Sequence, residues 1–276
     1  MIDLHVHSTA SDGTCTPSEI AAMGRDCRVL ALTDHDTAAG LPEFMSAEPG
    51  PAVRIPGMEL SLVPGEGFGR YHLLALGGDA SHPALSALVK RAAEGRVERN
   101  PRIIAKLAAL GMDVSMEEVA KEAGGEVIAR PHIARVLLKK GHVTSIKEAF
   151  DLYLADGRPA FAERWRPSPA EAFAAIHAAG GVAVMAHPKY WAPEPEKFRS
   201  GIVQQIELGL DGVEAVYSAN TIDETRLHLS VARESGLLVT AGSDFHGDNK
   251  PNVAFGMDIH DEDALVRPLL RRLGML

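Results

Sequence analysis

The sequence predicts an α/β fold whose strands close into a barrel, and three observations predict it. Short apolar runs typical of strands alternate with amphipathic, helix-like stretches along the 276 residues. A histidine or a carboxylate lies at or just after the end of most of these runs, as in barrels whose sites lie at the carboxyl ends of the strands. The alternation stops once, between residues 81 and 166, where helical signals dominate. A chain of this length fits one large domain with an insertion.

The N-terminal part of the chain contains four predicted strands and a marked helix start. The strands are expected at residues 2–6, 29–33, 53–60 and 71–76. Between the first two, Thr16, Pro17 and Glu19 predict an N-cap, a first-turn proline and a capping-box residue. We expect a parallel sheet, because strands that alternate with helices usually run in parallel.

The segment 81–166 is interpreted as a helical insertion that contributes to the substrate site. We expect it to interrupt one barrel, formed by residues 1–80 and 167–276, because strand and helix signals resume after it. Its helix starts are predicted at Asn100-Pro101, at Ser115 with Glu118, at Pro131, and at Ser145 with Glu148.

The C-terminal part returns to alternating strands and helices. Ser168, Pro169 and Glu171 predict the start of a helix that ends at Gly180-Gly181. Three strands are expected at residues 182–186, 212–217 and 237–241, which brings the total to seven. Helices are expected at residues 197–208 and 223–235, and in the tail from residue 261.

Composition excludes several classes of protein. The 28 basic and 37 acidic side chains give a net charge of −9, which argues against a broad basic surface for duplex DNA. Two cysteines, Cys15 and Cys27, exclude a disulfide scaffold and a four-thiolate zinc site. No apolar run reaches the roughly 18–20 residues that span a bilayer, and we see no secretory signal. We therefore expect a cytoplasmic enzyme without a membrane partner; its oligomeric state stays open.

Histidine is over-represented, and six of the twelve histidines lie on predicted strands or just after them. His5 and His7 are two residues apart on one strand, so both imidazoles face the same way. Glu59 lies in an apolar strand, where a carboxylate needs a metal or an arginine as its partner. Singly, each such residue has an ordinary explanation, such as a sheet histidine or an Asx turn. Jointly they predict a metal site with nine ligands: His5, His7, Asp12, His35, Glu59, His72, His187, Asp244 and His246.

Nine nitrogen and carboxylate ligands exceed the number that one or two metal ions need. With one bridging carboxylate they suit three divalent ions, each with an open position. Manganese, zinc and iron all accept imidazole and carboxylate ligands, so the identity of the ions stays open.

Six segments, in order along nearly the whole chain, resemble those of the PHP (polymerase and histidinol phosphatase) family. They are HVHSTASDG at 5–13, LTDHD at 32–36, GMELS at 57–61, YHLLALG at 71–77, AHP at 186–188 and GSDFHG at 242–247. The resemblance implies a distorted (β/α)7 barrel, a trinuclear metal centre and phosphoester hydrolysis. It also implies the grouping of the ligands: His5, His7 and Asp244 for one ion, His72 and His187 for a second, Glu59 bridging these two, and Asp12, His35 and His246 for the third.

Within the family, the segment ARPHIARVLLKKGHV at 129–143 resembles the stand-alone nucleotidases. The resemblance implies removal of a phosphate from a 3′,5′-nucleoside bisphosphate, and some relatives trim short 5′-phosphorylated RNA. Histidinol-phosphate phosphatases have a similar length and remain an alternative. No polymerase sequence is attached, which excludes the polymerase-linked exonucleases.

The predicted chemistry places positive charge on the metal ions. Three divalent ions and three carboxylates sum to about +3, so an acidic chain can still bind a small anionic phosphate substrate. We expect a metal-bridging hydroxide to attack phosphorus in line.

Four further residues are predicted to contact the substrate. Arg130 and Arg135 would hold a phosphate near a helix start, and His132 would contact it or protonate the leaving group. Ser8 would donate a hydrogen bond to phosphate. Weaker candidates are Lys189 for phosphate, and Trp165 and Tyr190 for stacking on a base.

Two other classes of function are open. Metal-dependent amide hydrolysis is disfavoured, because no predicted strand ends in the lysine that such barrels usually use. A non-catalytic, metal-stabilised scaffold would be expected to lose ligands, and none is missing. The remaining histidines are interpreted as structural or surface residues: His82, His142, His177, His228 and His260.

Overall fold

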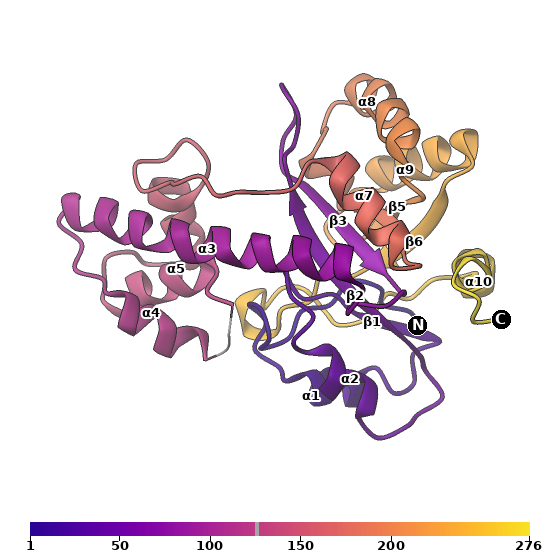
Figure 1. The fold of residues 1–276 in the computed structure, drawn as a ribbon, viewed down its shortest axis with the longest axis horizontal. Helices are drawn as coiled ribbons and strands as arrows, with labels where there is room; N and C mark the ends of the chain where they lie inside the picture. The colour runs from indigo at the N-terminus through magenta and orange to yellow at the C-terminus, as the bar shows by residue number, and fades with distance from the viewer. Residues whose placement is uncertain (125–126) are drawn as a thin grey trace.

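The computed structural model describes residues 1–124 and 127–276 and shows a mixed α/β fold built on one curled sheet (Figure 1). The sheet has six strands in the order β1-β2-β3-β4-β5-β6. They are β1 (Val29–Leu32), β2 (Val53–Leu62), β3 (Tyr71–Leu76), β4 (Val182–Ala186), β5 (Gly212–Tyr217) and β6 (Leu238–Gly242). An α/β fold was predicted, and the mixed α/β architecture confirms it.

The sheet is not wholly parallel, so this part of the prediction was wrong. β3 runs antiparallel to both β2 and β4, while the other neighbouring pairs are parallel. The reason lies in the connection: residues 63–70 link β2 to β3 without a helix. A connection this short can join only antiparallel neighbours, because a parallel pair needs a crossover of a dozen or more residues.

Residues 2–6, predicted as the first strand, make isolated backbone pairings instead of a regular strand. Asp3 pairs with Leu30 of β1, and Val6 pairs with Phe245 just after β6. The Leu4 N–H donates to the carbonyl of Ala241 at 3.0 Å. This segment therefore lies between the two edge strands, and it carries His5 and His7 into the interior.

Among the described residues, six helices cover the sheet, and two of them begin with caps that the sequence predicts. They are α1 (Pro17–Met23), α2 (Leu41–Ser46), α7 (Pro169–Ala178), α8 (Pro195–Leu208), α9 (Ile222–Ser235) and α10 (Glu262–Arg272). Reciprocal capping boxes join Thr16 to Glu19 and Ser168 to Glu171, as predicted. Two apolar cores fill the two faces of the sheet, one around Phe173 and Trp191 and the other around Val184 and Leu269.

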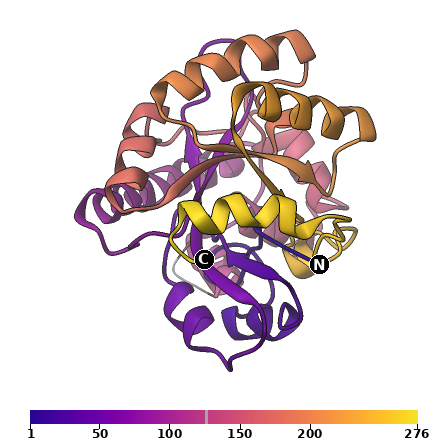
Figure 2. The same ribbon diagram turned by 90° about the vertical axis from the view of Figure 1, so that its right-hand side faces the viewer.

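The segment 81–166, which we continue to call the insertion as in the sequence-based prediction, is helical and has an apolar core of its own. It contains α3 (Pro83–Ala109), α4 (Met116–Ala123), α5 (Arg130–Lys139), α6 (Ile146–Ala149) and a π-helical turn at Phe150–Leu154. Ile103, Val119 and Ile133 belong to its core. In Figure 1 it extends from one side of the sheet, and both views place the chain termini on the opposite side (Figures 1 and 2). Within the described residues, no helix is long and apolar enough to span a bilayer.

One helix start in the insertion was predicted wrongly. Pro101 lies inside the long α3 and does not open a new helix. Helix continuity is favoured here by burial, because Asn100 is buried and its amide donates to the Ile128 carbonyl at 3.0 Å. The capping box of Ser115 and Glu118 is confirmed at the start of α4.

Candidate metal centre

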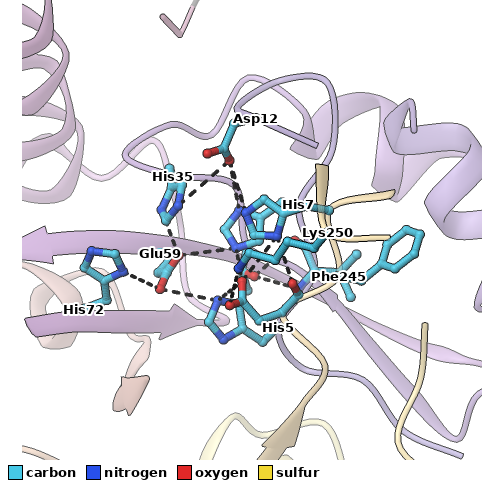
Figure 3. A network of polar contacts seen from close by, with 12 residues as sticks. His5, His7, Asp12, His35, Glu59, His72, Phe245 and Lys250 are labelled. Atoms are coloured by element: carbon cyan, nitrogen blue, oxygen red, sulfur yellow. Dashed lines mark hydrogen bonds and ion pairs between the residues drawn. The ribbon is translucent and has the colours of Figure 1, made fainter. Parts of the chain in front are cut away.

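All nine predicted ligands converge on one point at the end of the sheet nearest the insertion (Figure 3). Their nitrogen and oxygen atoms form four overlapping groups, and within each group the atoms lie within 4.8 Å of one another. The groups are His7 with Asp12, His35 and His246; His5 with His7 and Asp244; His5 with Glu59 and His187; and His35 with Glu59 and His72. These groups use every predicted ligand and no other described residue.

Glu59 on β2 is the centre of the cluster and is fully buried. Its Oε1 lies 2.8 Å from Nδ1 of His72 and 2.9 Å from Nε2 of His187. Its Oε2 lies 2.7 Å from Nδ1 of His35 and 3.3 Å from Nε2 of His7. A carboxylate whose two oxygens face different imidazoles is placed to bridge two ions.

The strand ends hold their side chains in unusual backbone conformations. His187, directly after β4, has φ of 29°, and Asp244, shortly after β6, has φ of 59°. Non-glycine residues with positive φ are strained and tend to occur where function fixes a side-chain direction. Both residues turn inward to the cluster.

The cluster carries strong internal electrostatics. Burial alone would raise the pKa of Asp12, Glu59 and Asp244, but all three pKa values lie well below the usual range. Neighbouring histidines lower the pKa of Asp12 and Glu59, and Lys250 together with histidines lowers that of Asp244. Burial opposes charge on His7, yet Asp244 and Glu59 raise its pKa to about 9. His246 is buried as well, and its pKa falls to about 4. The buried carboxylates therefore need positive charge nearby, and either protonated imidazoles or metal cations can provide it.

A metal fits this donor set. Six buried ring-nitrogen and carboxylate-oxygen atoms of the nine residues have no hydrogen-bond partner. They are Nε2 of His5, Nε2 of His7, Oδ1 of Asp12, Nδ1 of His35, Oε2 of Glu59 and Nδ1 of His187. Buried polar atoms without partners are costly, and a coordinated ion would satisfy several of them at once. Imidazole with carboxylate suits a divalent transition metal or zinc.

Glu214 on β5 supports the cluster and was missed by the sequence analysis. Its Oε1 accepts from Nδ1 of His5 at 2.9 Å, and its Oε2 accepts from the backbone N–H of His187 at 2.7 Å. It therefore fixes the ring orientation of His5 and leaves Nε2 to face the centre. A signal existed: Glu214, like Glu59, is a carboxylate in an otherwise apolar strand.

Glu214→Gln is expected to lower metal affinity, or kcat at fixed metal concentration, by about 10- to 100-fold. The amide keeps the shape but loses the charge that raises the pKa of His5. Chelator competition followed by metal analysis measures the change. Glu207→Gln, on the outer face of α8, is the matched control; equal metal affinity in both variants would contradict this role for Glu214.

The carboxylates on either side of His35 have their partners elsewhere. Within the described residues, neither Asp34 nor Asp36 bonds to the His35 imidazole. Asp34 accepts instead from the Ser8 hydroxyl at 2.7 Å, and Ser8 is completely buried. Ser8 therefore braces the turn that carries Asp12, and the geometry gives no support to its predicted contact with substrate.

A pocket of about 310 Å³ opens directly beside the cluster. Asp12, His35, His72 and His246 form part of its wall. The insertion supplies most of the rest, and the lining residues include many cations: Arg70, Arg96, Arg99, Arg130, Arg164, Arg166 and Lys250. Although the chain is acidic as a whole, it concentrates basic side chains around one cavity, so arginine and lysine add to the positive charge that metal ions would supply.

The arginines differ in how their charge is balanced. Arg164 pairs with Asp36 at 2.6 Å, and the Nε of Arg96 lies 3.1 Å from the same carboxylate. Arg130 pairs with Asp156 at 3.0 Å. Arg99 is buried, and within the described residues its guanidinium donates to the amide oxygen of Asn100.

Burial and the three neighbouring arginines lower the pKa of Arg99 well below its usual value. Its guanidinium forms no ion pair within residues 1–124 and 127–276. A buried arginine without a carboxylate, set in the wall of a cavity, is placed to receive an anion.

Three predicted substrate residues lie outside the pocket wall. Arg135 pairs with Glu122 at 3.2 Å. His132 is buried, and its Nδ1 accepts from the Ala129 N–H at 3.1 Å, which caps α5. Lys189 pairs with Glu224 at 2.8 Å.

The aromatic residues in the pocket wall are Phe150 and Phe161, and not the predicted Trp165 and Tyr190. Trp165 packs against the core, with the Arg91 guanidinium 5.6 Å from its ring centroid. The remaining histidines, interpreted above as structural or surface residues, are not part of the cluster. His177 lies 2.7 Å from Asp211, away from the cluster.

Known proteins resemble this chain over almost its full length. It is 34% identical over 281 residues to 3′,5′-nucleoside bisphosphate phosphatase of Chromobacterium violaceum, covering 99% of this chain and 96% of that protein. It is 38% identical over 248 residues to a 5′-3′ exoribonuclease of Haemophilus influenzae, covering 88% and 89%. No family model matches the chain.

Solved structures agree with these relatives. A metal-dependent phosphoesterase from Bifidobacterium adolescentis has a TM-score of 0.85 at 31% identity, covering 98% of this chain and 96% of that one. A Chromobacterium violaceum protein named an amidohydrolase, with bound sulfate, has a TM-score of 0.87 at 33% identity and the same coverage. From the identity and coverage of these relatives, together with the converging cluster, we conclude that the chain belongs to the PHP-type phosphoesterases, a family of metal-dependent hydrolases.

Proposed function

We propose that this enzyme removes the 3′-phosphate from a 3′,5′-nucleoside bisphosphate and leaves the 5′-monophosphate. The observation that carries the proposal is the basic pocket directly beside the cluster. A substrate with two phosphates can place one at the cluster and the other among the arginines. The name of the Chromobacterium violaceum relative supports the same substrate.

The same proposal includes the metal centre and the fold. Three divalent ions would be held by the nine residues, in the grouping that the family resemblance implies. The ligand atoms of His5, His7 and Asp244 lie close together, and those of Asp12, His35 and His246 lie close together in another group. Both observations support this grouping. The edge position of residues 2–6 supports a distorted (β/α)7 barrel, interrupted by an insertion at 81–166.

When bound, the ions would supply Lewis acidity and a water activated for attack at neutral pH. The protein residues would hold and orient the substrate. Arg99 and Arg130 would bind the phosphate that is not cleaved, by charge-assisted hydrogen bonds. A pocket of about 310 Å³ has the size of a small-ligand site.

His132 stays our candidate for a contact with the leaving group. Because its Nδ1 accepts a backbone N–H, the neutral ring carries its proton on Nε2. Burial lowers its pKa, which favours that neutral form, while the carboxylate of Asp12 acts in the opposite direction. Nε2 can therefore donate a hydrogen bond to the leaving oxygen, whereas the proton transfer predicted from the sequence would require a protonated ring, which the Ala129 N–H at Nδ1 opposes.

Arg130→Ala is expected to raise KM for a 3′,5′-bisphosphate by about 10- to 100-fold, because a charge-assisted hydrogen bond to phosphate is lost. The KM for phenyl phosphate, which lacks a second phosphate, should change little. Steady-state kinetics with both substrates measure the difference. Arg135→Ala is the matched control on the same helix, since Arg135 pairs with Glu122 outside the pocket. Equal effects of Arg130→Ala on the two substrates would count against the proposed phosphate site.

A hydrolysis panel tests the substrate class. It compares a 3′,5′-nucleoside bisphosphate, histidinol phosphate, a short 5′-phosphorylated oligoribonucleotide and an amide, all with metal-loaded protein. We expect the bisphosphate to have the highest kcat/KM. Preference for histidinol phosphate or for the oligoribonucleotide would change the proposed substrate but would still indicate phosphoester hydrolysis. Inactivity on all phosphoesters would favour a non-catalytic scaffold.

A further inference from the structure

Lys250 lies where the cluster meets the pocket, and the cluster described so far gives it no role. It follows β6 through a short 3-10 helix at Gly247–Asn249, and it lines the cavity together with Asp12 and His246. Figure 3 shows its side chain reaching the cluster. Its Nζ donates to Oδ2 of Asp244 at 2.5 Å. Its side chain is 38% exposed, so it is in contact with the space of the pocket.

The contacts of Asp244 separate its two oxygens. Oδ2 accepts from Lys250 and from the hydroxyl of Tyr217 at 3.1 Å. Oδ1 faces the imidazoles, 3.6 Å from Nε2 of His5 and 3.4 Å from Nε2 of His7. Lys250 therefore binds the side of the carboxylate that points away from the imidazoles, and it leaves the proposed ligand oxygen free.

The ammonium of Lys250 has capacity left for an anion. A lysine ammonium carries three donors, and within the described residues one of them is engaged, by Asp244. The arginines of the pocket are balanced differently, since Arg96 and Arg164 share Asp36, and Asp36 is not one of the proposed ligands.

We propose that Lys250 binds the phosphoryl group that is cleaved, donating to its oxygens while it keeps its hydrogen bond to Asp244. A lysine acts here as a point charge, which suits a phosphoryl group whose oxygens also face metal ions. The proposal rests on the phosphoesterase function proposed above and deepens it, because it divides the pocket into two phosphate positions. Lys250 serves the position at the cluster, and Arg99 and Arg130 serve the other.

The test measures binding of inorganic phosphate to metal-loaded protein by calorimetry, with the metal content of each sample determined. Lys250→Met is expected to weaken the phosphate Kd by about 10- to 100-fold with the metal content unchanged, and Lys250→Arg should recover most of the loss. Lys189→Met is the matched control, because Lys189 also pairs with a carboxylate but does not line the pocket.

Three results would overturn the proposal. One is an unchanged phosphate Kd in Lys250→Met with full metal content. Another is loss of metal in proportion to loss of phosphate binding, which would make Lys250 a support for Asp244 only. The third is a metal-loaded wild type that binds no phosphate. The titration involves no turnover, so phosphate binding can be interpreted independently of activity. Failure to hydrolyse nucleotides would contradict the proposed function but would not affect the binding result.

Discussion

Glu59→Gln is expected to lower kcat by about 10³-fold or more, since the loss of a bridging ligand removes several kcal/mol of transition-state stabilisation. The two oxygens of Glu59 lie near imidazoles on opposite sides, including His72 at 2.8 Å and His35 at 2.7 Å. The amide of glutamine has one oxygen and no charge, so it cannot bridge two cations. Activity and metal content, measured on the same sample, check the result.

Glu207→Gln again serves as the control for Glu59→Gln, and near-ultraviolet circular dichroism shows whether the core is intact. We expect the variant to be folded and to bind fewer ions per chain. A variant that keeps its full metal content and more than about a tenth of wild-type kcat would contradict the role of Glu59 as a bridge.

Asp36→Asn is expected to destabilise the fold by about 3–5 kcal/mol, because it leaves two buried arginines without a counter-ion. Asp36 is 1% exposed and pairs with Arg164 at 2.6 Å and with Arg96. Asparagine tolerates the φ of 52° at this position, so backbone strain does not explain the loss. Urea unfolding, compared at equal m-values, measures the change in the free energy of unfolding.

The pH dependence identifies the charge as the cause. Burial would raise the pKa of Asp36, but Arg164, Arg96 and the Ser61 N–H lower it below the unfolded value of 3.8. A lowered carboxyl pKa stabilises the fold above the unfolded pKa, and this contribution is lost as pH falls toward the folded pKa. The difference between wild type and Asp36→Asn should therefore be constant above about pH 4 and shrink below it.

Asp223→Asn is the control for Asp36→Asn, because Asp223 forms an exposed pair with Arg226. We expect its effect to be within about 0.5 kcal/mol. A similar effect of both substitutions, or a difference that grows as the pH falls, would show that Asp36 does not hold the insertion arginines as described.

The positions of the candidate ligands were predictable because each is marked locally in the sequence. His5 and His7 have the spacing of one strand face, and Asp244 follows an apolar run within a glycine-flanked turn. Parallel strands bring their carboxyl ends to one edge, so side chains at different strand ends meet in space. Capping boxes such as that of Ser168 and Glu171 were equally predictable, because their chemistry is contained within four residues.

The basic pocket was not predictable in the same way. Four of its arginines lie far apart in the sequence. Arg99 and Arg130 lie on helices, Arg164 lies in a loop, and Arg70 directly precedes β3. Their meeting depends on how the insertion folds against the sheet, which no local pattern specifies. The direction of β3 was missed for a related reason: it depends on the lack of a crossover helix, which a strand pattern does not reveal.

The most direct test of the account compares metal-depleted with reconstituted protein on a 3′,5′-nucleoside bisphosphate. Chelator-treated protein with no detectable metal should lose activity, and added Mn²⁺, Zn²⁺ or Fe²⁺ should restore it as ions bind to the nine-residue cluster. We expect up to three ions per chain and inorganic phosphate as a product. Full turnover by verified metal-free protein would contradict it.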